Sequence, residues 1–289
     1  QPNISNAGTE IEHAALMDAL KPFFAKNKEI DPRDLCNIPG SEVSINTPEG
    51  KHCFRKQYPI ADSMMPVFDE TVAEWKKNGY VIAAVASPWN NPVTFVSKKS
   101  TDGKVKWRGC MDLRLLNNIT EPMDNYSLSL PAHIFKEANG CHIYTLLDCS
   151  SAYMRLKVKE SDRVKLSFRH RNECLMWRSA CFGIKHMGSH FSRIMVIILG
   201  DLPNCYVYID DVILVTREND IEKHFELVRT AIKRLTAAKM ILNEEKAHIG
   251  KSCVVILGQI LSRQGRSVCP ERLANVHEWD YPKTGKELQ

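Results

Sequence analysis

The stretch Tyr206-Val-Tyr-Ile-Asp-Asp-Val-Ile-Leu-Val-Thr216, YVYIDDVILVT, places two adjacent carboxylates inside an apolar, β-branched run. Such runs are typical of buried strands. Two neighbouring charges are costly there unless something compensates them. Neighbouring side chains of a strand point to opposite faces, whereas those of a tight turn can share one side. We therefore expect strand, turn and strand, with Asp210 and Asp211 side by side at the hairpin tip.

A third carboxylate ends another strand-like segment. CHIYTLLD, residues 141–148, is apolar and finishes at Asp148. If this strand lies beside the hairpin, three carboxylates meet at adjacent strand ends and repel one another. Mg²⁺ prefers oxygen ligands, typically one or two carboxylates together with substrate phosphates. A divalent cation would offset the repulsion; the alternative is a solvent-exposed Asp-Asp turn, which is ordinary in proteins.

Length and composition limit the class of protein. The 289 residues allow one large domain or two ordinary ones, and a hydrophobic fraction of 44% indicates a globular core. No apolar run approaches the ~18 residues of a transmembrane span, and no secretory leader is recognisable, so we expect neither membrane association nor secretion. The net charge of +5 is only weak evidence for nucleic-acid binding. The chain begins with Gln1 rather than Met, so we expect a fragment or a processed product.

The ten cysteines are scattered through apolar segments. None forms a Cys-x-x-Cys pair, so the sequence predicts no zinc site. Small buried thiols of this kind favour a reducing compartment such as the cytoplasm.

The remaining pattern mixes helices with hairpins. Amphipathic spacing predicts helices at about 11–26, 66–78, 131–138, 189–199 and 221–239. Alternation predicts a hairpin over 92–113 with its turn at Asp102-Gly103, another over 151–180 turning near 169–172, and short strands around 254–260 and 267. Residues 41–61 look extended and loop-like. The mixture predicts an α+β fold.

Six segments follow one another along the chain: WKKNGYVIAAVASPWNNPV (75–93), WRGCMDLRLLN (107–117), TLLDCSSAYMRLKV (145–158), CFGIKHMGSHFSRIM (181–195), YIDD (208–211) and LNEEKAHIGKSCVVILGQILSRQG (242–265). Together, and in this order, they resemble the boxes of reverse transcriptases, the RNA-directed DNA polymerases, in the form found in the pol polyproteins of gypsy-like LTR retrotransposons. A single box would carry little weight, whereas six in order identify the family.

The resemblance implies an α+β right-hand polymerase fold with fingers and palm subdomains and most of the thumb missing. The implied boundaries are a linker preceding the polymerase at 1–44, fingers at 45–121 and 156–186, palm at 122–155 and 187–263 with the catalytic hairpin and primer grip in the latter, and the start of a truncated thumb at 264–289. RNase H, integrase and protease domains are expected in the parent polyprotein, outside this chain.

The resemblance also implies roles for single residues. Asp148, Asp210 and Asp211 fall on catalytic, metal-binding carboxylates, with the backbone carbonyl of Cys149 as a further ligand. The implied cofactors are two Mg²⁺ ions, with Mn²⁺ as an alternative, joining the primer 3′-hydroxyl to the incoming dNTP. The implied nucleotide-binding residues are Lys98, Arg108, Tyr153, Phe182, Tyr208 and Ile209, and the implied primer grip is Leu257 with Gly258.

Tyr153 falls on the aromatic residue that lies under the sugar, where a large ring would exclude a 2′-hydroxyl. Considered alone, a core aromatic is the favoured interpretation. Asp112, Arg114 and Asn117 match the fingers motif and are expected to organise structure or template contacts. Lys246 matches a lysine near the primer grip.

The sequence departs from the family pattern close to the implied site. Cys181 replaces the usual Pro, His186-Met187-Gly188 replaces Asn-Ala-Pro, Ala152 replaces Gly, and Ala247 replaces Cys. A second interpretation therefore stays open: a catalytically impaired retroelement relic that binds nucleic acid without polymerising. An RNA-dependent RNA polymerase is a rival within the same class, and Tyr153 argues against it. The implied partners are an RNA or DNA template with its primer, in the cytoplasm or in virus-like particles.

Overall fold

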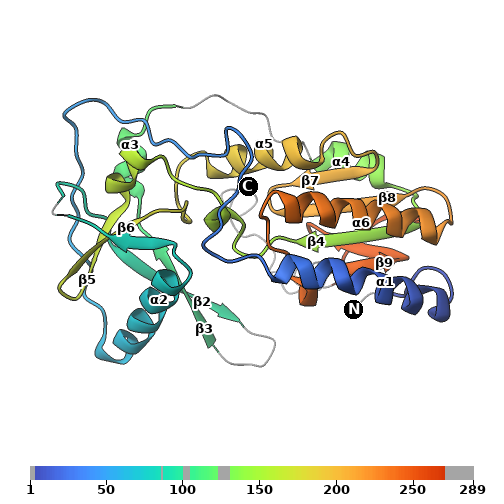
Figure 1. Cartoon of the computed structure of the whole chain (residues 1–289). Helices are drawn as coiled ribbons and strands as arrows, with labels where there is room; N and C mark the ends of the chain where they lie inside the picture. The colour runs from blue at the N-terminus through green and yellow to red at the C-terminus, as the bar shows by residue number, and fades with distance from the viewer. Residues whose placement is uncertain (1–3, 86, 100–104, 123–130, 271–289) are drawn as a thin grey trace, which may run out of the picture.

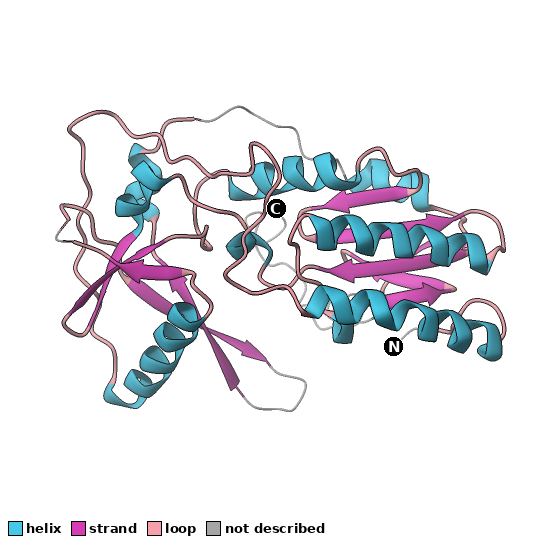
Figure 2. Ribbon diagram, viewed as in Figure 1, coloured by secondary structure: helices cyan, strands magenta, loops and turns pink. Residues whose placement is uncertain are grey.

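The computed structural model describes residues 4–85, 87–99, 105–122 and 131–270 and has two lobes (Figure 1). One lobe is built on a layer of strands covered by long helices, and the other on short strands, one helix and long loops (Figure 2). Within the described residues, no helix combines the length and apolar character that a membrane crossing needs.

The helix-covered lobe contains an antiparallel sheet of four strands. Its order is β7 (Cys205–Tyr208), β8 (Asp211–Thr216), β4 (Ile143–Asp148) and β9 (His248–Lys251). The stretch quoted at the outset therefore supplies β7 and β8, as predicted, and β4 is the predicted CHIYTLLD strand. Because β4 is the direct neighbour of β8, the end of one lies beside the start of the other.

Alternation along β8 separates two cores. Val212 and Leu214 belong to the larger core, which the helices α1 (Glu10–Lys28), α5 (Met187–Leu199) and α6 (Ile221–Ala237) share. Ile213 and Val215 belong to a smaller core. The period of two places successive side chains on opposite faces of the sheet. Both faces are covered, which explains why the strand is apolar throughout.

The smaller core is closed by α4 (Pro131–Ala138) and by a second sheet of short strands. That sheet has the order β10 (Cys253–Ile256), β11 (Gln259–Ser262) and β12 (Gly265–Val268), all antiparallel. It carries the segment that the sequence assigns to the primer grip.

The helix α1 lies within the stretch that the sequence assigns to a linker. A capping box of Thr9 and Glu12 starts it. Near its end, the Asn27 side chain donates to the Met240 carbonyl (2.9 Å) and accepts from the Leu242 amide (2.8 Å). The boundary at 44 stays a prediction, but α1 is a packed layer of this lobe rather than a free connector.

The other lobe is built on a sheet of order β1 (Val81–Ala83), β6 (Glu173–Trp177) and β5 (Ser167–His170) and on the hairpin of β2 (Val93–Lys99) and β3 (Val105–Met111). The predicted turn of that hairpin, Asp102-Gly103, lies outside the described residues.

Helix α2 (Met65–Lys77) links these strands. Its Phe68 ring meets Phe95 of β2 at 5.5 Å, and its Trp75 ring meets Trp177 of β6 at 4.7 Å. A short η1 turn (Asp62–Met64) precedes α2. Sequence reasoning did not predict α3 (Arg114–Ile119).

The hairpin predicted over 151–180 is shorter in the structure, where only β5 and β6 form it. Ser151 has a φ of 50° and turns the chain out of β4 into the short helices η2 (Ala152–Arg155) and η3 (Glu160–Leu166). Asp162 accepts from the Ile45 amide at 3.0 Å, a partner far away in sequence. Hydrogen bonds between residues so far apart in sequence leave no trace in the local alternation of apolar and polar residues. That alternation alone therefore suggested a strand.

His224 of α6 joins the helix to two strands of the four-stranded sheet. Its fully buried ring bonds Thr145 of β4 (2.7 Å) and Thr216 of β8 (2.9 Å). Burial lowers the pKa of His224 from 6.5 to about 4. The unfolded chain therefore binds a proton that the native chain does not, so the free energy of unfolding should fall by about 3 kcal/mol between pH 6.5 and pH 4.

Denaturant unfolding across this pH range measures the effect. We expect the acid-side loss of stability to be smaller by that amount in His224→Gln, and unchanged in the control His133→Gln, whose ring is exposed on α4. Parallel pH profiles of His224→Gln and the unaltered chain would contradict the assignment.

Candidate active site

Asp148 and Asp211 face each other across the sheet. They form the last pair of the β4–β8 ladder, and Tyr208 pairs with Asp211 to close a two-residue turn of Ile209 and Asp210. Directly opposed Cα atoms of antiparallel strands lie only ~4.5–5.5 Å apart. The structure therefore confirms the prediction that Asp148 lies beside the hairpin.

The turn itself is strained. Ile209 has a φ of 55°, a left-handed conformation that is uncommon for a β-branched residue. Such residues cost ~1–3 kcal/mol and are found mostly at functional sites. Here the strain sets the direction of Asp210, the next residue. Asp211 then begins β8.

The neighbouring carboxylates act on the pKa of Asp211. Burial, followed by the charges of Asp210 and Asp148, raises the pKa of Asp211 to about 6, while Lys246 opposes the rise. The Lys246 ammonium lies 3.1 Å from the Asp148 carboxylate. A site that disfavours its own negative charges in this way favours a bound cation.

The donor set fits a hard divalent cation by chemistry. Asp148 is paired with Asp211 and Asp210 occupies the adjoining turn, and among the hydrogen bonds of the described residues the Cys149 carbonyl is not used. Burial raises the pKa of the Cys149 thiol to about 12, so the thiol stays protonated in the metal-free protein and the oxygen ligand that Cys149 offers is its carbonyl. Across the described ranges, however, no three carboxylate, histidine or cysteine side chains converge as metal ligands do. The Lys246 ammonium is the cation that contacts the cluster.

A cleft of about 450 Å³ opens beside the carboxylates. It brings together most of the residues that the sequence predicted for metal and nucleotide binding. Those residues are Asp148, Cys149, Asp210, Arg108, Tyr153 and Phe182. Lys246, which the sequence places near the primer grip, also lines the cleft.

Aromatic rings form one wall of the cleft. Tyr153 of η2 meets Phe182 at 5.4 Å and Phe191 of α5 at 5.5 Å, both edge to face. The Arg108 guanidinium lies over the Phe182 ring, 5.1 Å from its centre. A cation, two rings and the carboxylates thus lie along one continuous surface.

Two predicted nucleotide-binding residues lie outside the lining of the cleft, and the side chain of a third is not described. Among the described residues that line the cleft, Tyr208 and Ile209 are not included, and Tyr208 packs against the smaller core. Lys98 lies opposite Lys106 in the β2–β3 ladder, but its side chain is outside the described part of the structure. The roles of all three stay predictions.

The predicted primer grip is a tight turn between β10 and β11. Leu257 and Gly258 have φ values of 50° and 74°, the left-handed pair that two-residue hairpins need. Leu257 lines a second groove, of about 470 Å³, together with Asp148 and Asp211. The turn therefore shares a groove with Asp148 and Asp211.

The fingers motif organises structure. Asp112 accepts from the Tyr58 hydroxyl (2.6 Å) and from the Arg114 guanidinium (2.7 Å). Asn117 donates to the Gly183 carbonyl at 2.8 Å, which holds the segment next to Phe182. Contacts of these residues with a template stay a prediction.

Sequence reasoning missed other residues that line the cleft, among them Trp107, Glu74 and Asn243. The backbone amide of Asn243 also donates to the Asp148 backbone carbonyl at 2.9 Å. Trp107 and Asn243 lie inside quoted boxes and could have been found there. Glu74 lies on α2 and reaches the cleft only through packing of that helix.

The architecture is matched by solved structures of polymerases. Over 98% of this chain and 49% of the other, it superposes with a TM-score of 0.83 and 22% identity on the foamy viral protease-reverse transcriptase dRH in complex with double-stranded DNA. The structure of the foamy viral protease-reverse transcriptase in complex with RNA/DNA hybrid gives a TM-score of 0.81 at 20% identity, over 98% of this chain and 37% of the other. The fold is therefore that of a right-hand polymerase.

Residues 96–261 match the profile of the family described as reverse transcriptase (RNA-dependent DNA polymerase). The chain belongs to that family.

Relatives lie among retrotransposon polyproteins. The chain is 29% identical to the retrovirus-related Pol polyprotein from transposon opus of Drosophila melanogaster, covering 86% of this chain and 24% of the relative. It is 30% identical to the polyprotein from transposon gypsy of the same organism (83% and 23%) and 28% identical to the transposon Tf2-3 polyprotein of Schizosaccharomyces pombe (96% and 21%). It spans about a quarter of the length of these relatives or less.

Proposed function

We propose that this chain is an RNA-directed DNA polymerase that adds dNTPs to a primer 3′-hydroxyl. The observation that carries the proposal is the β4–β8 ladder, which sets Asp148 opposite Asp211 beside a strained turn with Asp210. Asp148 and Asp210 border the same cleft as Arg108 and Tyr153. Cation, sugar and phosphate sites would thus be adjacent.

The residues divide the work by chemistry. Two Mg²⁺ ions, with Mn²⁺ as an alternative, would be held by Asp148, Asp210, Asp211 and the Cys149 carbonyl, and would supply Lewis-acid stabilisation of the phosphoryl transfer. Arg108 offers a planar fork that matches phosphate oxygens. Its position over Phe182 keeps the fork at the cleft wall.

The substrate class follows from Tyr153. Its ring is held between Phe182 and Phe191, so it cannot easily withdraw from the cleft. A rigid ring beneath the sugar would exclude a 2′-hydroxyl and select deoxynucleotides.

Partners and compartment are proposed on separate grounds. Solved structures of the same fold are complexes with RNA/DNA hybrid and with double-stranded DNA, which supports a primed template as partner. All ten cysteines are free thiols, which supports the reducing cytoplasm, including virus-like particles there.

A second candidate function is binding of nucleic acid without polymerisation. The contact of Lys246 with Asp148 favours it, because an ammonium neutralises one of the proposed metal ligands. His186, which replaces the family's Asn, starts α5 with a φ of 63° and makes no side-chain cap. Both functions predict binding of a primed template, but only the polymerase predicts a longer primer.

Binding and extension should be measured on one substrate, a DNA primer annealed to an RNA template. We expect a complex and, with Mg²⁺ and dNTPs, a longer primer. A complex that yields no extension with Mg²⁺ or Mn²⁺ would overturn the polymerase and favour the relic.

Binding should depend steeply on salt. Lys106, Arg108 and Lys246 line the cleft, and each phosphate contact releases counterions from the nucleic acid. We expect log affinity to fall against log salt with a slope of about −3 or steeper, and Arg108→Met to reduce the slope by about one.

The matched control is Lys21→Met, which removes an exposed lysine paired with Asp18 on α1. Titration of a labelled primer–template at several salt concentrations measures the slopes. A shallow slope in the unaltered chain would assign binding to base stacking instead.

A further inference from the structure

Arg155 is a buried cation at the junction of the two lobes. Its side chain is 0% exposed, although arginine is rarely buried without compensation. It lies two residues after Tyr153, in the same short helix η2. A fully desolvated guanidinium must find hydrogen-bond acceptors for its donors, and those acceptors reveal what it holds together.

Its acceptors are backbone carbonyls of distant segments. Nε donates to Lys239 at 2.9 Å, at the end of α6, and Nη1 donates to Pro32 at 2.8 Å. Nη2 donates to the Asp34 carbonyl. The Tyr80 side chain, from the lobe of short strands, lies near enough to the guanidinium to oppose the lowering of its pKa by burial. One side chain therefore joins η2 to the N-terminal segment and to the end of α6, with Tyr80 of the other lobe beside it.

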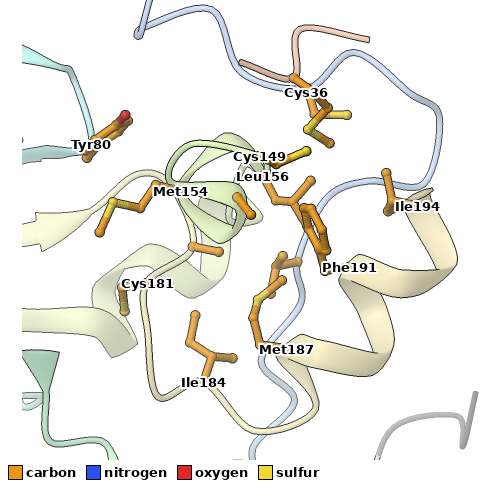
Figure 3. Packing of buried hydrophobic residues seen from close by; sticks show 14 of the residues in the cluster. Cys36, Tyr80, Cys149, Met154, Leu156, Cys181, Ile184, Met187, Phe191 and Ile194 are labelled. Carbon is orange, nitrogen blue, oxygen red and sulfur yellow. The ribbon is translucent and has the colours of Figure 1, made fainter. Parts of the chain in front are cut away.

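The N-terminal segment involved is residues 30–46, called the strap below. The Cys36 amide donates to the Arg155 carbonyl at 2.7 Å, and the Val43 amide to the Lys157 carbonyl at 2.8 Å. Figure 3 shows Cys36 of the strap near Cys149 and Leu156, with Tyr80 on the opposite side of the turn that carries Met154. The strap thus follows the chain through and beyond η2.

The turn η2 is fixed at both ends. Ser151 enters it with a φ of 50°, and the amide of Leu156 closes it on the Tyr153 carbonyl at 3.0 Å. The Arg155 side chain then anchors its exit. Since Tyr153 lies between these two points, its ring position depends on both.

We propose that Arg155 is a positioning residue that locks η2 against the strap, α6 and Tyr80, and thereby sets the place of Tyr153 in the nucleotide cleft. The inference rests on the proposed polymerase function and assigns sugar selection in part to a residue that does not touch the nucleotide. It also gives residues 30–46 a role in the site, in place of a passive connection.

Steady-state incorporation of matched dNTP and rNTP by Arg155→Met, Arg155→Lys and the unaltered chain tests the proposal. For Arg155→Met we expect KM for the dNTP to rise roughly ten- to hundredfold, as for small misplacements of a binding group, with a smaller change in kcat. The preference for dNTP over rNTP should fall. Arg155→Lys, which keeps the charge and three donors, should lie between the two.

The matched control is Arg178→Met. Arg178 also donates to the strap, at the Arg33 carbonyl (3.2 Å), but its other side-chain bond goes to Gly79. It should keep the KM and the sugar preference of the unaltered chain. The proposal would be overturned if both Arg155 variants kept the KM and the sugar preference of the unaltered chain. This comparison is made at a temperature where the variants are folded.

Hydrogen exchange of the same variants gives a readout that needs no activity. We expect faster exchange in residues 152–156 and 32–36 of the folded Arg155 variants, and unchanged exchange in α2. If the unaltered chain extends no primer, the proposed function fails, and exchange still decides the inference. The inference would be overturned if exchange in η2 and the strap matched that of the unaltered chain. It would also be overturned if exchange rose equally in every element.

Discussion

Asp210→Asn should abolish primer extension. The amide is nearly isosteric but neutral, so the proposed metal site loses a ligand charge. Metal ions stabilise phosphoryl transfer by several kcal/mol, so we expect a loss of at least about 10³-fold, or about 4 kcal/mol, in the rate of incorporation. The fold should persist, because removing a charge that raises the pKa of Asp211 relieves repulsion in the metal-free protein.

The control is Asp201→Asn, the same change at an exposed carboxylate paired with Arg234 behind the sheet. Single-turnover extension and metal-free thermal unfolding are measured for both variants. We expect Asp201→Asn to extend primers normally, and the Tm of Asp210→Asn to hold or rise. Extension by Asp210→Asn close to the normal rate would remove Asp210 from the metal site.

Tyr153→Val should weaken the choice between deoxy- and ribonucleotides. The ring borders the cleft, and its removal opens space where a 2′-hydroxyl would lie. Steric exclusion of one oxygen is worth a few kcal/mol at most, so we expect the preference for dNTP to fall by about ten- to a hundredfold. The measurement is the ratio of kcat/KM for matched dNTP and rNTP.

Tyr153→Phe is the control, because it keeps the ring and removes only the hydroxyl. It should retain the normal preference. A residue that merely fills the core would behave differently: Tyr153→Val would cost roughly 3–5 kcal/mol of stability and lower both incorporations together. An unchanged ratio with a lowered Tm would assign Tyr153 to the core and reopen the question of the substrate.

Local pattern was sufficient for the central strands. β-branched runs and the Asp-Asp turn predicted β7, β8 and β4, because both cores impose apolar residues on them. The carboxylates were predictable as a group for the same reason: they interrupt strands that are otherwise apolar. How deeply each carboxylate is buried was not predictable. The raised pKa of Asp211, for example, depends on its depth in the folded chain.

Long-range contacts account for what the sequence did not reveal. The short helices η2 and η3 depend on partners such as Ile45 and Pro32, over a hundred residues away. Strand β9, which pairs with β4, was missed because His248–Lys251 is short and lacks alternation. Asn27 bonds the chain after α6 at two points, so a segment that reads as a linker is part of the fold.

The place of Tyr208 in the YIDD box predicts a contact with primer or nucleotide, and that contact stays a prediction. In the structure its partly buried side chain packs against the smaller core. Tyr208 pairs directly with Asp211, so the two side chains lie on the same face of the sheet.

Addition of a single nucleotide to a DNA primer on an RNA template tests the assignment of Asp148, Asp210 and Asp211 most directly. The unaltered chain is mixed with the primed template and one dNTP at a time, with Mg²⁺ or with EDTA. We predict a primer one nucleotide longer, only for the dNTP complementary to the template base and only with the metal. A bound primer that stays at its original length with every dNTP, in Mg²⁺ and in Mn²⁺, would contradict the assignment.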